Sequence, residues 1–287
     1  MDSRKILEIY KLINDRSPKP VSAWPTIADI PQGMRVLDSD GVVKQKVGDY
    51  LIPASVTIIG SGLLAAAPVA SAANQNMYYM STDYGLCKCV SVFNNEGTDF
   101  VNCGRPSFLS YLSTVTRVGY RCKVGFRVTT AGYAALVGLG GSTATRQLAM
   151  GLISTGISAN IYIGGVITSP GPSLQAIGVW GFIDVKYPKT GTPTITTSSG
   201  SFTASSGSVD YAGDLYLGAL SNGGDNFEGM ISSVKFWDDA GTLLDIYDFN
   251  TWDGSSSGMS LMGNPYTVTK GSPFTERAFA WVPLSVL

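Results

Sequence analysis

Four cysteines are the first residues whose type and spacing suggest chemistry. Cys87 and Cys89 form a C-x-C pair, and Cys103 and Cys122 follow at wider intervals. Four thiolates can hold a structural zinc ion, but zinc motifs ordinarily pair their cysteines as C-x-x-C. The charged segment that follows Met1 does not resemble a signal peptide, which favours reduced thiols. We therefore expect four plain thiols, with zinc and disulfides as the alternatives.

Hydrolytic chemistry has little support in the composition. The chain contains no histidine, which excludes Ser-His-Asp and Cys-His machinery and imidazole zinc sites. Glycosidases need two carboxylates at a defined separation, and no predicted strand carries alternating acids. Asp238 and Asp239 are adjacent and fit a turn. The chain is therefore predicted not to be an enzyme.

Ligand binding has more candidates than catalysis. Several Asp and Asn side chains occur between residues 210 and 226, where converging oxygens would suit calcium and where turns select the same residues. Aromatic rings in the same part of the chain suit the apolar face of a sugar, although most such rings in a β-sandwich belong to the core. Calcium is left open, and no other cofactor is expected. The predicted ligand-binding residues are Tyr211, Asp214, Asn222, Asp225, Asn226 and Trp252.

Charge is unevenly distributed along the chain. Residues 1–50 contain 8 Lys/Arg and 7 Asp/Glu, whereas residues 51–287 contain only 12 and 14. This division predicts a charged N-terminal arm attached to a charge-poor β body. The net charge of −1 does not fit a protein that binds nucleic-acid phosphates.

The arm is predicted to begin with a helix over Ser3–Asp15, because apolar residues recur there at three- and four-residue spacing. Four prolines then indicate an extended segment over 17–33. An Asp-Gly turn between residues 34–37 and 42–47 predicts a hairpin. Short helices and extended arms are stable mainly against another protein, so docking is expected of Ile6, Leu7, Tyr10, Ile13 and Trp24.

The uncharged stretch Ile52–Ala73 has the length of a membrane span and ends in a sequence similar to a cleavage site. Prolines and glycines interrupt it, and its alanines make it only mildly apolar. We therefore expect no membrane insertion and interpret the stretch as an extended segment packed against a partner surface.

The body is predicted to be all β. Short apolar runs recur every ten to fifteen residues with turn residues between them and no helical stretch, as in a β-sandwich. The Thr/Ser-rich segment 190–209 is interpreted as a long hairpin, and residues 278–282 as a final strand. The expected strands are 77–81, 87–93, 120–129, 134–138, 161–167, 177–186, 215–218, 230–237 and 243–249.

One stretch resembles a known family. Leu215–Gly218 followed by Phe227-x-Gly229-x-Ile231-x-x-Val234-x-Phe236-Trp237 is similar to a signature of concanavalin A-like lectin/laminin G-like jelly rolls. The resemblance covers about residues 100–260. It implies an antiparallel β-sandwich with Val234 and Phe236 in the core. The family includes sugar binders, protein binders, glycosidases and inert modules, so it indicates a fold rather than a function.

These patterns predict three parts: a docking arm at 1–50, a small β or assembly segment at 51–95, and a concanavalin A-like sandwich at 96–287. The arrangement resembles phage virion proteins such as head fibres, decoration proteins and tail appendages. We expect a non-enzymatic virion surface protein, a homotrimer, docked to other virion proteins and able to bind a host glycan. A standalone carbohydrate-binding module is the alternative.

Overall fold

The computed structural model divides the chain into two compact units, residues 1–89 and 90–287. Each unit is described by itself. The predicted boundaries at residues 50 and 95 stay a prediction. The described residues are 19–20, 26–30, 32, 34–37, 43–47, 49–111, 119–130, 134–139, 148–153, 158–163, 166–168, 176–203, 213–220, 226–250, 252–269 and 277–287. The predicted helix and most of the extended arm lie outside them.

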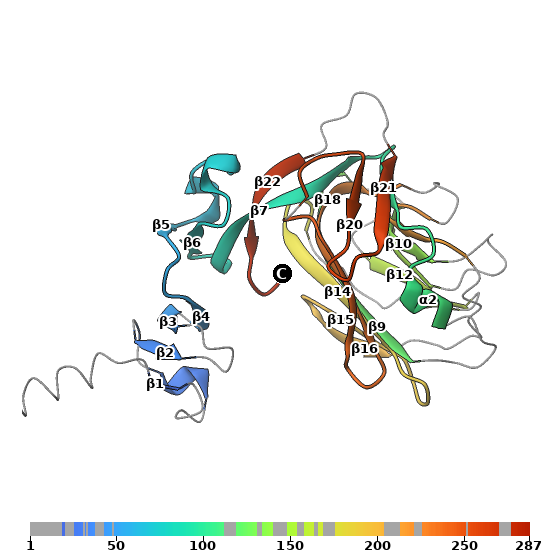
Figure 1. The fold of residues 1–287 in the computed structure, drawn as a ribbon, viewed down its shortest axis with the longest axis horizontal. Coiled ribbons are helices and arrows are strands. Elements are labelled where there is room, and N and C mark those ends of the chain that lie inside the picture. Colours follow the sequence, from blue (N-terminus) through green and yellow to red (C-terminus); the bar gives the residue numbers. More distant parts are fainter. Residues whose placement is uncertain are drawn as a thin grey trace, which may run out of the picture. The chain divides into compact units, whose positions relative to one another are not determined.

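The first unit begins with a four-stranded sheet of order β1-β2-β3-β4 (Figure 1). Its β2–β3 pair is the predicted hairpin, with Val36 opposite Lys44. Lys46 is buried, and its ammonium donates to the carbonyl oxygens of Ile27 and Ala28 at 2.5 and 3.0 Å. The elements are β1 (Lys19–Pro20), a 3-10 helix (Ile27–Asp29), β2 (Arg35–Leu37), β3 (Val43–Val47) and β4 (Tyr50–Pro53).

Residues 52–73 form no membrane-length helix. They contain the end of β4, strand β5 (Ile58–Gly62), a 3-10 turn (Leu64–Ala66) and the start of a second one (Ala72–Asn74). Strand β5 pairs in parallel with β6 (Tyr78–Ser81), which pairs with the first residues of β7 (Gly85–Glu96). Within the described residues, no helix is long and apolar enough to cross a membrane.

The second unit is an antiparallel β-sandwich of the predicted concanavalin A-like, jelly-roll class (Figure 1). One sheet has the order β13-β12-β11-β10-β17-β8-β21-β20. The other has the order β16-β15-β14-β9-β18-β7, with β19 also on β18 and β22 also on β7.

The bounds of the first sheet's strands are β8 (Phe100–Asn102), β10 (Ala134–Leu139), β11 (Leu148–Ile153), β12 (Ser158–Ile163), β13 (Val166–Thr168), β17 (Leu215–Leu217), β20 (Ser257–Met259) and β21 (Pro265–Thr269). The second sheet contains, besides β7, the strands β9 (Tyr120–Val128), β14 (Trp180–Tyr187), β15 (Thr194–Thr197), β16 (Gly200–Thr203), β18 (Glu228–Asp238), β19 (Leu243–Asp248) and β22 (Arg277–Pro283).

Strand β9 shows how the sequence forms the core. Its side chains alternate, so that Cys122, Val124 and Phe126 are buried between the sheets while Arg121 and Lys123 lie on the outer face. The opposite sheet contributes aliphatic side chains from β10 and β17 to the same core. A one-residue slip of β9 would move its apolar side chains to solvent and its cations into the core, which fixes the register.

The family-like motif lies in β18. Val234 and Phe236 are buried in the core, as predicted, and Ile231 is buried there too. A register shift between Ile231 and Ser233 explains why two residues separate Ile231 from Val234. Gly229 has φ +151°, and a Cβ there would lie 2.3 Å from the carbonyl oxygen of Arg127. Only glycine fits this close approach of two strands.

Three expectations need correction. The single strand predicted at 161–167 is two strands, β12 and β13, which pair antiparallel, because the Gly164-Gly165 sequence between them breaks the run. The body was expected to lack helix, yet α2 covers Ser107–Tyr111, too short for a recognisable periodicity. Strands β8, β11, β20 and β21 were not predicted. The 194–203 hairpin and the final strand β22 are confirmed.

All four cysteines are free, buried thiols. Burial raises the pKa of Cys103 and Cys122 well above the ordinary thiol value and that of Cys87 to about 12. We therefore expect native protein to react very slowly with Ellman's reagent at mildly alkaline pH, because the thiolate is the reactive form. All four thiols should react promptly in guanidinium chloride. One rapid equivalent in the native protein would contradict the buried assignment.

Candidate functional site

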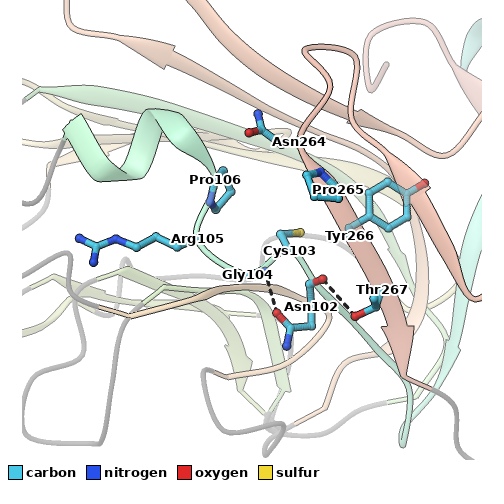
Figure 2. A pocket seen from close by; sticks show the side chains of 9 residues that line it. All are labelled: Asn102, Cys103, Gly104, Arg105, Pro106, Asn264, Pro265, Tyr266 and Thr267. Carbon is cyan, nitrogen blue, oxygen red and sulfur yellow. Dashed lines mark hydrogen bonds between the residues drawn. The ribbon is translucent and has the colours of Figure 1, made fainter.

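A pocket of about 320 Å³ opens where β8 and β21 separate (Figure 2). The two strands pair as far as Asn102, opposite Thr267. Beyond Asn102 the chain turns toward β17: the Cys103 and Leu215 amides donate to the carbonyl oxygens of Leu215 and Gly104, at 2.9 and 2.7 Å. This change of partner leaves the space that the pocket occupies. Its lining is Asn102, Cys103, Gly104, Arg105, Pro106, Asn264, Pro265, Tyr266 and Thr267.

The pocket wall is held by hydrogen bonds across the sequence. The side-chain oxygen of Asn102 accepts from the Gly104 amide at 2.7 Å, which shapes the loop below the opening. Asn264 spans the other side, because its side-chain oxygen accepts from the amide and hydroxyl of Ser107, both at 3.2 Å. The first residue of α2 is thereby tied to the turn before β21.

Asp245 is the anchor of that turn. It is completely buried, and its carboxylate accepts from four donors: the Ile246 and Met262 amides at 2.7 and 3.2 Å, the Ser260 hydroxyl at 2.8 Å and the Asn264 side-chain amide at 2.6 Å. A buried carboxylate without an adjacent cation needs such donors to offset its lost hydration. Asn264 is thus held by Asp245 on one side and Ser107 on the other.

The lining favours binding over acid–base chemistry. None of the nine lining residues is Asp or Glu. Burial raises the pKa of the Cys103 thiol, and the pKa of Tyr266 is raised to about 12 for the same reason. Neither group is poised to ionise near neutral pH. What the pocket offers a ligand is amide, guanidinium and hydroxyl groups beside two proline rings.

The predicted ligand-binding residues do not meet in this pocket. Trp252 is 3% exposed, packs against Phe93 and Phe249, and donates from its indole nitrogen to the Ser255 carbonyl oxygen at 3.0 Å. Its ring is part of the core and offers no sugar platform, which corrects that prediction. Asp214 is exposed before β17.

Asn226 bridges to Ala135, and its side-chain oxygen is buried without a partner among the described residues. Tyr211, Asn222 and Asp225 lie outside the described residues, as do the docking residues Ile6, Leu7, Tyr10, Ile13 and Trp24. In the described part of the chain, no three His, Cys, Asp or Glu side chains gather as a metal site. A calcium site therefore stays a prediction from the sequence.

The other aromatic candidates divide between core and surface. Trp180 and Tyr187 are buried, in agreement with the core interpretation. Trp237 is half-buried on the outer face of β18, where the Arg121 guanidinium lies 4.7 Å from its ring centroid.

Sequence analysis missed the pocket residues. They come from two segments more than 150 residues apart, and each segment by itself shows only the Gly, Pro and Asn chemistry of ordinary turns. No local signal distinguishes them from the chain's many other turns.

Comparisons with known proteins find no matching family model and no matching curated protein. Among solved structures, domains LG4-5 of the mouse laminin alpha1 chain have a TM-score of 0.37 at 14% identity, covering 57% of this chain and 47% of that chain. The binding domain of Botulinum neurotoxin DC in complex with rat synaptotagmin II has a TM-score of 0.35 at 14% identity, covering 60% of this chain and 47% of that chain.

A mutant Trypanosoma rangeli sialidase gives a TM-score of 0.34 at 14% identity, covering 44% of this chain and 21% of that chain. The chain thus spans less than half the length of each of these three structures. The fold assignment stands on the strand order and register of this chain itself.

Replacing Asp245 with alanine should lower the free energy of unfolding by about 3 kcal/mol, because one buried and three part-buried donors lose their acceptor. Urea unfolding followed by tryptophan fluorescence measures this. Asp253→Ala is the matched control: that carboxylate is exposed and accepts from the Ser255 amide at 2.8 Å, so a much smaller change is expected. Equal effects of the two substitutions would contradict the anchoring role.

Proposed function

We propose that this chain is a non-enzymatic glycan-binding protein displayed on a virion surface. The pocket at the β8–β21 opening carries the binding part of the proposal. Its volume of about 320 Å³ lies at the lower end of the range for small-ligand sites and suits one or two sugar rings. Its walls belong to a rigid sheet and an anchored turn, so little ordering cost is incurred on binding.

The chemistry of the lining supports a neutral polyhydroxylated ligand. Asn102, Arg105 and Thr267 supply the polar side chains of the lining, and the Thr267 hydroxyl donates to the Asn102 carbonyl oxygen at 3.5 Å while its lone pairs can still accept from a ligand (Figure 2). Amide and hydroxyl groups pair with sugar hydroxyls as both donors and acceptors. Pro106 and Pro265 give the apolar surface that packs on sugar carbons. With no carboxylate in the lining, hydrolysis has no general acid, and the chain acts as a binder.

The virion part of the proposal rests on the chain's organisation. Charged residues concentrate in 1–50, where an amphipathic helix and a proline-rich arm are expected to dock onto other virion proteins. The stretch 52–73 exposes Leu63 at 61% and Val69 at 87%, apolar surface that a neighbouring subunit would cover. We propose a homotrimer assembled through this stretch; native mass spectrometry gives the number of chains directly.

A glycan array probed with the full chain tests the binding function. We expect at least one glycan to bind, and Arg105→Ala and Thr267→Val to weaken that binding about tenfold each, because each removes a hydrogen bond of about 1.4 kcal/mol. The matched control is Arg35→Ala, an exposed arginine on β2 of the other unit. Absence of any bound glycan would refute the function, and unchanged binding in both pocket variants would place the site elsewhere.

Docking is tested by incorporation into particles. Leu7→Asp combined with Tyr10→Asp should abolish incorporation, because both positions belong to the predicted apolar face. Glu8→Gln, on the polar side of the same segment, should leave it unchanged. Glycan binding by the purified double variant should be retained, which separates docking from binding. Normal incorporation of the double variant would overturn the docking role.

A further inference from the structure

The outer face of the second sheet concentrates the positive charge of the body. Residues 51–287 contain twelve Lys and Arg in all. Five of them lie on this one face of three adjacent strands, β9, β14 and β18: Arg121, Lys123, Arg127, Lys186 and Lys235. By alternation the same strands present two carboxylates there: Asp184 among the cations and Glu228 at the far end of β18. The chain as a whole is slightly acidic, so this concentration is a local feature.

Register places like charges directly opposite one another. Lys186 on β14 is opposite Arg121 on β9, and Lys235 on β18 is opposite Lys123 on β9. Directly opposed like charges destabilise a sheet. The Lys123 ammonium donates to the Ser285 carbonyl oxygen at 3.3 Å, and the Lys235 ammonium donates to the main-chain oxygen of Leu287. Asp184 lies opposite Lys123, and Asp248 is close enough to Lys235 to favour its charged form, so the charge of these two lysines is partly balanced. Arg121 and Lys186 therefore carry the accessible positive charge of the face.

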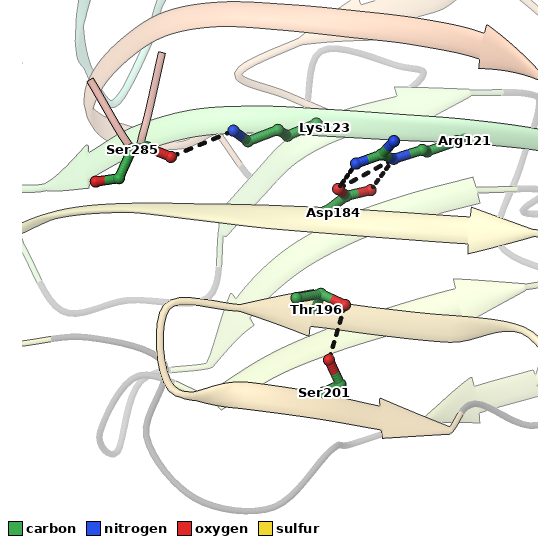
Figure 3. A network of polar contacts seen from close by, with 6 residues as sticks. All are labelled: Arg121, Lys123, Asp184, Thr196, Ser201 and Ser285. Atoms are coloured by element: carbon green, nitrogen blue, oxygen red, sulfur yellow. Dashed lines mark hydrogen bonds and ion pairs between the residues drawn. The ribbon is translucent and has the colours of Figure 1, made fainter. Parts of the chain in front are cut away.

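Arg121 is held in a fixed orientation with unused donors. It makes a bidentate pair with Asp184, from Nε at 2.8 Å and from Nη2 at a short distance (Figure 3). The Trp237 ring lies against the guanidinium. The two Nη1 hydrogens have no partner among the described residues, and the side chain is 44% exposed. Lys186 is exposed and likewise unpaired within the described part of the chain.

Hydroxyl groups continue this surface onto the next two strands. Thr196 on β15 lies opposite both Asp184 and Ser201 on β16, and the two hydroxyls hydrogen-bond at 3.0 Å (Figure 3). From β18 to β16 the surface crosses five strands, about 19 Å at the usual strand spacing. Cations and an aromatic ring therefore occupy one end of the surface, and hydroxyls occupy the other.

We propose that this outer face binds an acidic glycan, a chain of sugars bearing sulfate or carboxylate groups. The anionic groups pair with Arg121 and Lys186, and the hydroxyls of Thr196 and Ser201 pair with sugar hydroxyls. The hydroxyl row and the overall acidity of the chain favour a glycan over nucleic acid or an acidic peptide. The site is separate from the pocket and does not rest on the glycan function proposed for it.

Isothermal titration of the full chain with a heparin oligosaccharide and with oligogalacturonate tests the proposal. At least one of them should bind at low salt, and Lys186→Glu should leave any binding of a neutral dextran oligosaccharide unchanged. Lys186→Glu should weaken binding at least fivefold, in line with the loss of one exposed ion pair. The matched control is Lys189→Glu, an exposed lysine in the turn after β14, which should leave binding unchanged. Unfolding curves of both variants check that the fold is intact.

Several results would overturn the proposal. The first is that neither acidic glycan binds. The second is that Lys186→Glu and Lys189→Glu weaken glycan binding equally. The third is that double-stranded DNA or polyglutamate binds as tightly as the acidic glycans, or more tightly. Binding that is lost in Arg105→Ala but kept in Lys186→Glu would move the acidic ligand to the pocket and also overturn it. Failure of the array experiment leaves this titration unaffected, because the two sites use different residues.

Discussion

The strict alternation of side chains along β9 is the constraint on which the rest of the sandwich depends. Because Cys122, Val124 and Phe126 must lie in the core, the register of β9 with β14 and β18 admits no slip. The same register puts Arg121 and Lys123 opposite other cations on the outer face. The packing that stabilises the body therefore also creates its most basic surface. The repulsion between like charges on that surface is tolerated because burial of the inward side chains contributes more free energy than the repulsion costs.

Asp245, on β19 of the same sheet, plays a corresponding part for the turn between β20 and β21 of the other sheet. A buried carboxylate is costly, and here four donors satisfy it, three from the turn and one from the next residue of its own strand. The result is a rigid wall that positions Asn264 and keeps the pocket open. That turn exposes Met259, Leu261 and Met262. The turn's conformation thus comes from a polar interaction beneath it rather than from burial of its own side chains.

The two proposed binding surfaces differ in the physics that would select their ligands. The pocket is small, uncharged in its walls except for Arg105, and shaped for a neutral sugar. The outer face is open, broad and cationic, and its ligand would be selected mainly by charge. A protein that carries both kinds of surface on one sandwich can engage a cell coat at two points, which strengthens attachment beyond the affinity of either contact alone.

The sequence by itself determined the fold class, most of the strands, the 34–47 hairpin and the inward positions Val234 and Phe236, since these follow from period-two alternation and turn residues that are local properties of the chain. Tertiary structure alone decided the sites. Trp252 is a core residue because Phe93 and Phe249 enclose it, which local sequence does not reveal. Asn102 meets Asn264 around one pocket, and Arg121 meets Lys186 across one face, through strand pairing between distant segments. Such pairings depend on sheet order, and sheet order is set by the packing of the whole sandwich.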